Sequence, residues 1–355
     1  MKKLKPIFYG YICFTIMLSS MLFAVPQKKN IIIIATGGTI AGASKSTTST
    51  AYKPASLDID SLISTIPDLA RIANIQGEQL VQIASQEMND DIWLKLAKRV
   101  NQMANDPKID GIVITHGTDT MEETAYFLNL VLKTRKPVVL VGSMRPATAL
   151  SADGPLNLFK AVLVASSELA FNNGVLILLN DEIHQARYAT KYNTTKTNSF
   201  ISPNTGPLGH VVGEVLHFYQ KPLKIHTIKS IFDISHLNEL PKVDIVYSYA
   251  NADGITVKAL VENKAKGIIV AGTGNGNPSP SLMEYLIDAR KKGVHVVRSS
   301  RCGSGITTKA SEVDDQKQRF ISANSLNPQK SRVLLMLALT KTNNWQEIQK
   351  YFDTY

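Results

Sequence analysis

Residues 31–42 read Ile-Ile-Ile-Ile-Ala-Thr-Gly-Gly-Thr-Ile-Ala-Gly, so a continuous apolar run ends in a glycine-rich turn. A run of β-branched residues without polar alternation is typical of a strand that is buried on both faces of a sheet. Similar runs occupy 111–115, 138–142 and 174–179, and segments with helical spacing lie between the runs. This alternation predicts right-handed βαβ units that form a mostly parallel sheet.

Three segments of this half have helical signals. Asn89 is suited to cap a helix with apolar residues at positions 92, 96 and 100, and helical spacing also covers 121–132 and 156–170. The pattern loosens at 220–241, where polar residues and two prolines predict a linker.

The alternation of strands and helices resumes after this linker. Strands are predicted at 245–249, 267–271 and 294–298, and helices at 281–292 and 330–339. We therefore expect an α/β fold in which a larger N-terminal domain, mostly a parallel sheet, is joined to a smaller C-terminal α/β domain. The predicted boundaries are 25–219 for the first domain, 220–241 for the linker and 242–355 for the second.

Composition limits the possible classes of protein. The chain has 355 residues, of which 44% are hydrophobic and 19% charged, which excludes a disordered or fibrous protein and allows a large core. The formal net charge is +10, but basic and acidic residues are mixed along the chain. We interpret this charge as a solvated surface and expect no nucleic-acid partner.

The N-terminus has the pattern of a secretory signal. Lys2, Lys3 and Lys5 precede an apolar run at 7–23 that ends in Ala24. We predict a signal peptide at 1–24 and export to the periplasm, with secretion as the alternative. An uncleaved membrane anchor is the competing interpretation, because the run is close to the shortest that spans a bilayer.

Cysteine usage predicts neither a disulfide nor a metal site. Cys13 would leave with the signal peptide, and Cys302 would then be alone, so we expect it to be a buried small side chain. The histidines show no metal-ligand spacing, and we expect no metal and no cofactor.

Ligands of open parallel sheets bind beyond the carboxyl ends of the strands, which directs attention to the loop at 36–42. Adjacent Gly37 and Gly38 allow a close backbone approach, with threonine hydroxyls and main-chain N–H groups facing the ligand. Gly37 and Gly42 have the spacing of a phosphate-binding loop. That motif requires Lys and then Ser or Thr directly after the second glycine, whereas this chain has Ala43 and Ser44.

The next two strands also end in polar loops. Residues 116–123 read His-Gly-Thr-Asp-Thr-Met-Glu-Glu and present Thr118 and Asp119 side by side at a helix start. Helix capping is an equally good explanation for this pair on spacing alone. Residues 142–146, Gly-Ser-Met-Arg-Pro, indicate by themselves only a turn.

Together the motifs at 35–40, 115–123 and 142–146 resemble those of the bacterial type II (periplasmic) L-asparaginases, in the asparaginase/glutaminase family. The resemblance covers essentially the whole mature chain and extends through 251–252, 274–277, 298–301, 312–315 and 326–330. It implies hydrolysis of L-asparagine to L-aspartate and ammonia through a threonine acyl-enzyme. It also implies a homotetramer, a dimer of tight dimers, that shares its sites between subunits.

The resemblance implies catalytic roles for six residues. Thr39 matches the nucleophile, and Tyr52 matches the tyrosine that assists it. Thr118, Asp119 and Lys191 match a second group beside the substrate. Glu312 matches a residue that reaches into the site of a neighbouring subunit.

Substrate binding is implied for an overlapping set. Its members lie mainly in the loops that follow the predicted strands, and Asn277 is expected to act across a subunit boundary. The implied substrate-binding residues are Gly38, Ser85, Gln86, Thr118, Asp119, Ser143 and Asn277.

The chemistry is consistent with these roles. A threonine hydroxyl is a weak nucleophile that needs a base or a strong hydrogen-bond partner, and Tyr52, Glu312 or Lys191 could each serve. Backbone N–H groups in the glycine loop and near Thr118 could stabilise an oxyanion. Asp119 supplies the carboxylate that a substrate α-ammonium needs.

The chain also departs from the family pattern. Many relatives have a disulfide near the positions of Asn105 and Thr134, where this chain has no cysteine. Many asparaginases have Ala at the position of Ser143, whereas relatives that hydrolyse glutamine readily tend to have Ser, so we predict side activity on L-glutamine. A periplasmic amino-acid-binding protein remains the alternative of a different class. It would bind asparagine without releasing ammonia.

Overall fold

The structure is a computed structural model that describes residues 27–355 except 45, 49 and 50. The predicted signal peptide at 1–24 lies outside the described residues. Within the described part of the chain, no helix is both long enough and apolar enough to cross a bilayer.

The N-terminal half contains an eight-stranded sheet in the order β10-β9-β6-β5-β4-β3-β1-β2. Strands β2, β1, β3, β4 and β5 are parallel, and β6, β9 and β10 are antiparallel. The prediction of a mostly parallel sheet is therefore confirmed. The strands are β1 (Lys29–Gly37), β2 (Ala73–Ile83), β3 (Gly111–Thr115), β4 (Val138–Val141), β5 (Val175–Leu179), β6 (Glu182–Gln185), β9 (Gly209–Val212) and β10 (Val215–Phe218).

The chain turns from β5 into antiparallel β6 through Asn180 and Asp181, which both have positive φ (48° and 70°). Two positive φ angles are the requirement of the tightest hairpin turns, and Asn and Asp tolerate them better than most residues. The backbone conformation of Asn180 and Asp181 therefore ends the parallel part of the sheet.

The parallel strands lie in the order 2-1-3-4-5, so the direction of winding reverses between β1 and β3. In open α/β sheets, the crevice at such a reversal is where ligands bind. The loops that follow β1 and β3 carry Thr39 and Thr118, and they therefore flank the position that the topology favours.

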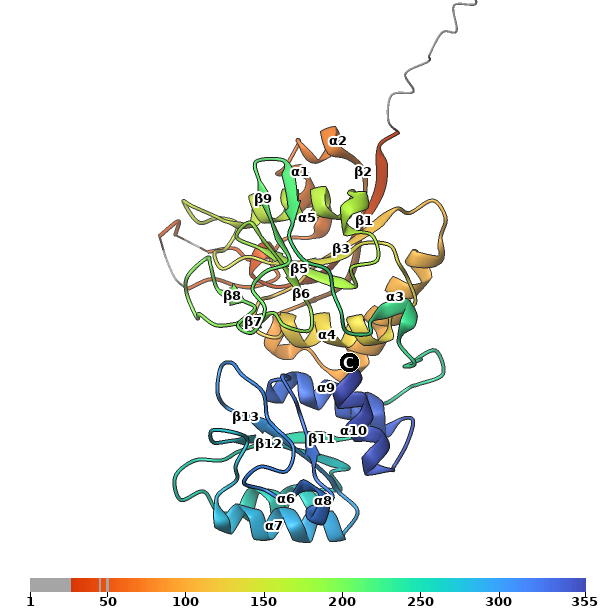
Figure 1. The fold of residues 1–355 in the computed structure, drawn as a ribbon. Coiled ribbons are helices and arrows are strands. Elements are labelled where there is room, and N and C mark those ends of the chain that lie inside the picture. The colour runs from red at the N-terminus through yellow and green to blue at the C-terminus, as the bar shows by residue number, and fades with distance from the viewer. Residues whose placement is uncertain (1–26, 45, 49–50) are drawn as a thin grey trace, which may run out of the picture.

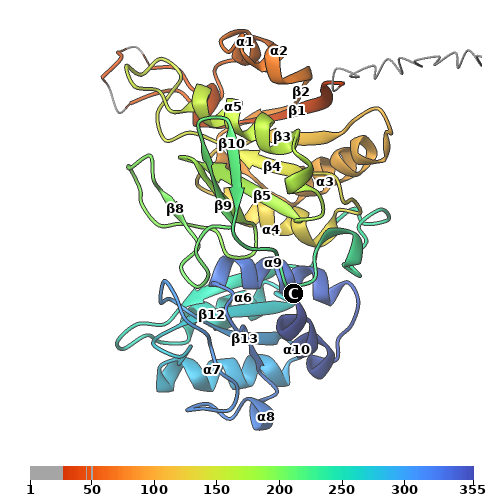
Figure 2. The same cartoon turned by 45° about the horizontal axis from the view of Figure 1, so that its top comes forward.

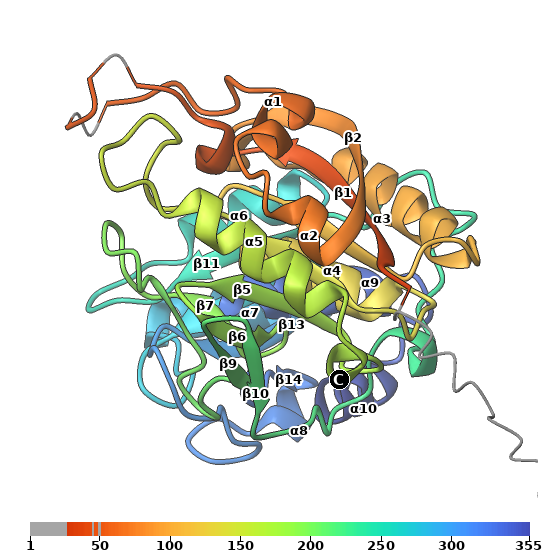
Figure 3. The same cartoon turned by 90° about the horizontal axis from the view of Figure 1, so that it is seen from above.

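Helices cover both faces of this sheet, as Figures 1 and 3 show. Within β1, Ile31 and Ile33 pack toward α5, while Ile32 and Ile34 pack toward α3 and α4. This alternation confirms that the strand is buried on both faces. The helices are α1 (Ile59–Ser64), α2 (Leu69–Ile72) and α5 (Gly154–Ala165) on one face, and α3 (Asp90–Asn105) and α4 (Met121–Val131) on the other.

Two helix boundaries illustrate local control. The Asn89 side chain accepts a hydrogen bond from the Ile92 amide at 3.0 Å, which confirms it as the N-cap of α3. The helix predicted at 156–170 ends earlier, at Ala165. Ser167 then accepts a hydrogen bond from Leu169 and starts the short helix η3 (Glu168–Ala170), because serine side chains compete for backbone groups.

The C-terminal half forms a second, parallel sheet in the order β11-β12-β13-β14. In Figures 1 and 2 its helix α9 lies between the two sheets, and α6 and α7 cover the outer face, while α10 packs beside α9 and β14. The elements are β11 (Val243–Tyr247), α6 (Ile255–Glu262), β12 (Gly267–Gly272), α7 (Pro280–Lys291), β13 (His295–Ser300), α8 (Asp315–Gln318), β14 (Ile321–Ser322), α9 (Pro328–Leu339) and α10 (Trp345–Thr354).

One hydrophobic cluster runs through both halves. It joins the face of the first sheet that α3 and α4 cover, through α4 and α9, with residues of the second sheet such as Ile269 and Val297. The segment at 220–241 contains the short helix η4 (Thr227–Lys229) and buries Phe232 and Ile234 in this cluster. Its role as a domain boundary stays a prediction.

The prediction that Cys302 is buried is wrong. Its side chain is exposed in the loop that follows β13, between polar and glycine residues. A single hydrophobic residue in such a loop has no partners for burial.

Glu123, in the first turn of α4, is partly buried beside Arg332 of α9, and the charge of the adjacent Glu122 is also close. Burial, with a smaller effect of Glu122, raises the pKa of Glu123 to about 7. The folded protein then binds this proton more tightly than the unfolded chain, so stability is lost as the pH rises from about 4.5 to about 7.

We expect Glu123→Gln to raise the free energy of unfolding at pH 8 by up to about 3 kcal/mol and to change it little at pH 4.5. Urea unfolding of both proteins at the two pH values measures this difference. Glu284→Gln, at an exposed position on α7, is the matched control. An equal effect of Glu123→Gln at both pH values would contradict the assignment.

Candidate active site

Three loops meet through glycine backbones at the carboxyl ends of β1, β2 and β3. A Cβ atom at Gly38 would lie 2.3 Å from the backbone nitrogen of Gly117, and one at Gly117 would lie 2.6 Å from Ser85 Oγ. Any side chain at these glycines would therefore push the loops apart. Gly38 also has φ 86° and ψ −172°, a region that is almost restricted to glycine.

We expect Gly38→Ala to lower kcat/KM on L-asparagine, the substrate that the sequence resemblance implies, about a hundredfold or more, because a shift of about 1 Å between reacting groups has such an effect. Backbone strain is expected to reduce stability by about 1–3 kcal/mol. The control is Gly213→Ala in the β9–β10 turn, where φ is +61° but no heavy atom lies within 4 Å of the added Cβ. Equal losses in both variants would show that φ strain alone is responsible.

Thr39 lies directly after Gly38, at the start of the short helix η1 (Thr39–Ala41). Its hydroxyl is 2.7 Å from the Tyr52 hydroxyl, and either group could donate the hydrogen bond. The Thr39 side chain is buried, whereas Tyr52 is partly exposed. The absence of a side chain at Gly42 makes room for the tyrosine ring, because a Cβ there would lie 2.9 Å from Tyr52 Cδ2.

A second polar group follows β3. Lys191 Nζ donates to Thr118 Oγ1 at 2.8 Å and to Asp119 Oδ1 at 2.6 Å. Lys191 comes from the small hairpin of β7 (Thr190–Lys191) and β8 (Phe200–Ile201), so the cluster joins residues that are far apart in sequence. The structure brings these three predicted residues together.

Helix capping does not explain Thr118 and Asp119. The N-cap of α4 is Thr120, whose side chain makes no capping hydrogen bond within the described residues. The Thr118 hydroxyl and the Asp119 carboxylate instead accept hydrogen bonds from Lys191. The pair is therefore arranged around an ammonium group.

The loop after β2 is joined to this cluster. The Asp119 amide donates to Ser85 Oγ at 3.2 Å, and Thr120 Oγ1 donates to the Ser85 carbonyl at 2.8 Å. Ser85 is buried, while the neighbouring Gln86 is exposed. These two predicted substrate-binding residues therefore differ in their surroundings, although both belong to η2 (Ser85–Glu87).

Ser143 follows β4 and is fully buried. Its hydroxyl donates to the Arg145 carbonyl at 2.7 Å, so its proton is already committed. The same loop is held by Asp153, which accepts from the amides of Met144 and Arg145 at 3.0 and 2.9 Å. These hydrogen bonds fix the backbone of the loop after β4.

Two further residues support the site, although no sequence pattern assigned them a role. His116 is buried and its pKa is lowered to about 4 by that burial, so the ring is neutral at pH 7. Its Nδ1 lies 2.7 Å from the Gly117 carbonyl, which can only accept. The other ring nitrogen then accepts from Thr124, whose hydroxyl in turn accepts from Trp93. This chain of hydrogen bonds fixes the backbone immediately before Thr118.

Glu122 is the second supporting residue. It accepts hydrogen bonds from Lys330 Nζ at 3.0 Å, from Thr190 Oγ1 at 2.9 Å and from the Lys191 amide at 3.3 Å. Burial opposes its ionisation, but Lys330 and the hydrogen bonds outweigh burial and lower the pKa of Glu122. A buried carboxylate therefore holds the backbone of Lys191 against α9. The sequence shows two adjacent acids at 122–123, and the fold determines that Glu122 is the one that forms the buried ion pair with Lys330.

The last two predicted residues lie on the C-terminal half. Asn277 donates through Nδ2 to Glu312, which is exposed. Within the described residues, no hydrogen bond joins this pair to Thr39, Tyr52, Thr118 or Lys191. A cavity of about 470 Å³ has Lys191 and Asn275 in its wall, and Thr39 and Thr118 are not among its lining residues.

The assembled groups are a threonine hydroxyl with a phenol partner, an ammonium group, a carboxylate and several loop amides. A hydroxyl with a hydrogen-bond partner can act as a nucleophile, and loop amides can stabilise an oxyanion. The arrangement suits acyl transfer from an amide or ester to water.

Comparison with known proteins points to one family. Residues 30–224 match the family model "Asparaginase, N-terminal", and residues 242–352 match "Glutaminase/Asparaginase C-terminal domain". A probable periplasmic L-asparaginase of Haemophilus influenzae is 51% identical over 92% of this chain and 93% of its own length. A glutaminase-asparaginase of Pseudomonas fluorescens is 49% identical over 92% and 90%, respectively. The crystal structure of a probable cytoplasmic L-asparaginase from Campylobacter jejuni matches with a TM-score of 0.90 and 50% identity, covering 92% of this chain and all of that one.

Proposed function

Because the chain belongs to the asparaginase family, we propose that it hydrolyses L-asparagine to L-aspartate and ammonia. The observation that carries this proposal is the pair formed by the Thr39 and Tyr52 hydroxyls, 2.7 Å apart, beside the loop that holds Thr118, Asp119 and Lys191. Relatives that are named as asparaginases support the choice of substrate.

The proposed reaction has two halves. The Thr39 oxygen bonds to the carboxamide carbon of the substrate, the carbon–nitrogen bond breaks, and ammonia leaves with the proton that the hydroxyl gave up. Water then cleaves the acyl-threonine ester and restores the hydroxyl. Tyr52 contacts the Thr39 hydroxyl directly, which favours it over Lys191 as the group that receives this proton while passing its own phenol proton to the departing ammonia.

The group formed by Thr118, Asp119 and Lys191 is proposed to bind the substrate, while loop amides polarise its carboxamide. Asp119 would hold the α-ammonium of the substrate, and Lys191 would fix both Asp119 and the Thr118 hydroxyl. Loop amides around Gly38 and Gly117 would face the developing oxyanion. Ser85 and Gln86 would complete the binding of the substrate's α-substituents.

Ammonia release from L-asparagine by the purified chain tests the proposal, with hydroxylamine added to trap the acyl-enzyme as a hydroxamate. Both products are expected. Saturable binding of asparagine by a folded protein with neither ammonia nor hydroxamate would indicate an amino-acid-binding protein instead.

We also propose that L-glutamine is a poorer second substrate, and that Ser143 contributes to this tolerance. Ser143→Ala is expected to lower the ratio of kcat/KM for glutamine to that for asparagine by about 3- to 10-fold, since one small group in a pocket has an effect of roughly 1 kcal/mol. Parallel ammonia assays with both amides measure the ratio. Ser151→Ala, in an exposed turn, is the control, and an unchanged ratio in Ser143→Ala would refute the role.

The proposed assembly is a homotetramer, a dimer of tight dimers, in which Asn277 and Glu312 complete a neighbour's site. The exposure of Glu312 supports this arrangement, as does the lack of any hydrogen bond, within the described residues, from the pair to the Thr39 loop. The large apolar side chains of Tyr192, Tyr247 and Ile306 are also more than half exposed, as interface residues would be in a single chain. Light scattering of the purified protein tests the assembly, and a stable monomer with full activity would exclude it.

Export is proposed from the N-terminal pattern at 1–24, with the periplasm as the destination. The name of the Haemophilus relative supports a periplasmic location, whereas the Campylobacter relative of known structure is described as a probable cytoplasmic protein. Mass spectrometry of the protein from periplasmic extracts tests the prediction. An N-terminus that retains residues 1–24 there would contradict cleavage after Ala24.

A further inference from the structure

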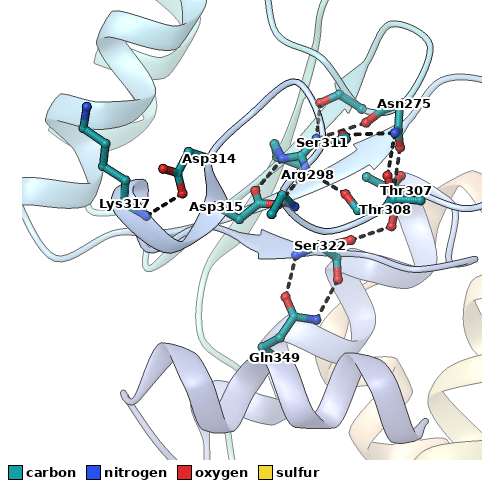
Figure 4. A network of polar contacts seen from close by, with 12 residues as sticks. Asn275, Arg298, Thr307, Thr308, Ser311, Asp314, Asp315, Lys317, Ser322 and Gln349 are labelled. Carbon is teal, nitrogen blue, oxygen red and sulfur yellow. Dashed lines mark hydrogen bonds and ion pairs between the residues drawn. The ribbon is translucent and has the colours of Figure 1, made fainter.

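Arg298 of β13 and Asp315 of α8 form a buried, two-pronged ion pair, which Figure 4 shows. Arg298 Nε donates to Asp315 Oδ1 at 2.6 Å, and Nη2 donates to Oδ2 at 2.7 Å. The side chains are 0% and 7% exposed. Planar guanidinium and carboxylate groups paired in this way fix each other's orientation as well as their distance.

The remaining donors of Arg298 reach two different loops. Nη1 donates to the carbonyls of Asn275 and Gly276 at 3.0 and 3.4 Å, and Nη2 also donates to the carbonyl of Thr308 at 3.0 Å. One side chain therefore holds the backbone of the loop after β12 and of the loop after β13.

The two loops are also tied to each other. Asn275 Nδ2 donates to the hydroxyls of Thr308 and Ser311 at 2.6 and 3.1 Å, and the Thr308 amide donates back to Asn275 Oδ1 at 2.8 Å. Asp315 fixes the far end of the second loop by accepting from the Ala310 amide at 3.1 Å. Figure 4 shows the polar side chains of these loops gathered beside Arg298.

The tips of the loops carry the two residues that would act across the subunit boundary. Asn277 directly follows Gly276, and Glu312 lies between Ser311 and Asp315. Their side chains bond to each other. Glu312 is exposed, and its side chain accepts a hydrogen bond from Asn277 at the tips of the two joined loops.

A buried ion pair is a weak source of stability, because desolvation offsets most of the attraction between the charges. Its geometric specificity is the property that hydrophobic residues of the same volume could not supply. The position of the pair, under two loops that each end in a predicted site residue, indicates what that specificity is used for.

We propose that Arg298, oriented by Asp315, is a positioning residue that holds Asn277 and Glu312 in the conformation that completes a neighbouring subunit's active site. The inference rests on the proposed function and on the proposed sharing of sites. Arg298 itself touches no reacting atom and acts on the chemistry of another chain.

The first test is Arg298→Lys, which keeps the positive charge but cannot form the two parallel hydrogen bonds of the guanidinium to Asp315. We expect a folded tetramer whose kcat/KM for asparagine is lowered about 10- to 100-fold, since misplacement of groups by about 1 Å has effects of this size. Arg99→Lys is the matched control, because Arg99 makes the same two-pronged pair with Glu78 at 2.7 and 2.6 Å, far from these loops. Unchanged kinetics in Arg298→Lys, or an equal loss in Arg99→Lys, would overturn the proposal.

The decisive test is complementation between inactive chains. Differently tagged Thr39→Ala and Arg298→Met chains are co-expressed, and hybrids are purified through both tags. In a hybrid dimer one of the two sites combines an intact Thr39 with intact loops from the other chain, so about half of the wild-type activity per dimer is expected to return. A merely structural defect in the Arg298→Met chain would not be repaired in this way.

The outcomes separate the two proposals. No recovery in hybrids of two folded parents would overturn the positioning role while leaving the proposed function intact. A folded wild-type tetramer that releases no ammonia from L-asparagine would overturn the proposed function and this inference with it. If Arg298→Met does not assemble, the Arg298→Lys chain takes its place in the same experiment, with recovery measured from its own reduced activity.

Discussion

Replacing Thr39 by alanine is expected to lower kcat for L-asparagine at least about a thousandfold, which corresponds to about 4 kcal/mol of lost transition-state stabilisation. The variant lacks the oxygen that would form the acyl-enzyme, and Tyr52 loses its partner at 2.7 Å. Single-turnover ammonia release measures the chemical step, and hydroxamate formation is expected to disappear. Thr39→Ser keeps a hydroxyl and is expected to retain part of the rate.

Thr36→Val is the matched control for this experiment. Thr36, near the end of β1, is also buried, and its hydroxyl donates to the Thr115 carbonyl at 2.8 Å. Its replacement is expected to reduce stability by about 1–3 kcal/mol by leaving that carbonyl without a donor. The activity of the folded variant should remain near that of the wild type. A larger loss of kcat in Thr36→Val than in Thr39→Ala would indicate Thr36, and not Thr39, as the nucleophile.

The second large effect is expected for Lys191→Met, which should lower kcat about a hundredfold or more, because misplacement of groups in a site by about 1 Å has effects of this size. Methionine keeps the apolar stem and removes the two hydrogen bonds to Thr118 and Asp119. Folding should be little affected, because Glu122 holds the backbone at residue 191 through its amide.

Steady-state kinetics with thermal unfolding of the same samples would separate a loss of kcat from a loss of folding stability. Lys196→Met is the control, because Lys196 is an exposed lysine in the turn of the same hairpin. A Lys191→Met protein with more than a tenth of the wild-type kcat would show that Lys191 only fills space.

The central strands could be predicted from sequence because both of their faces are buried. β1 and β3 are continuous apolar runs, and a parallel sheet covered by helices is the one common setting for such runs. The edge strands escaped prediction for the opposite reason. β10 alternates exposed and half-buried residues over only four positions, and most residues of β2 are partly exposed.

The site residues divide in the same way. Thr39 and Thr118 lie directly after buried strands, where topology directs ligands, so position alone made them candidates. His116 also follows β3 directly, but Arg298 lies within β13 and Glu122 within α4, and no sequence pattern assigned a role to any of the three. Each acts through burial and through partners brought from other elements of the fold, and a sequence does not state which charged residues are enclosed. Arg298 was visible only as part of a family motif without a role.

The helix α9 has a consequence for the biogenesis of the protein. It covers the α4 side of the first sheet, although it lies near the end of the chain. During synthesis from the N-terminus, the apolar surface of α4 therefore stays uncovered until residues 328–339 have emerged. Partly made chains with such a surface are prone to aggregate. A fragment that stops within 220–241 should accordingly need a chaperone to stay in solution, even though it contains Thr39, Thr118 and Lys191.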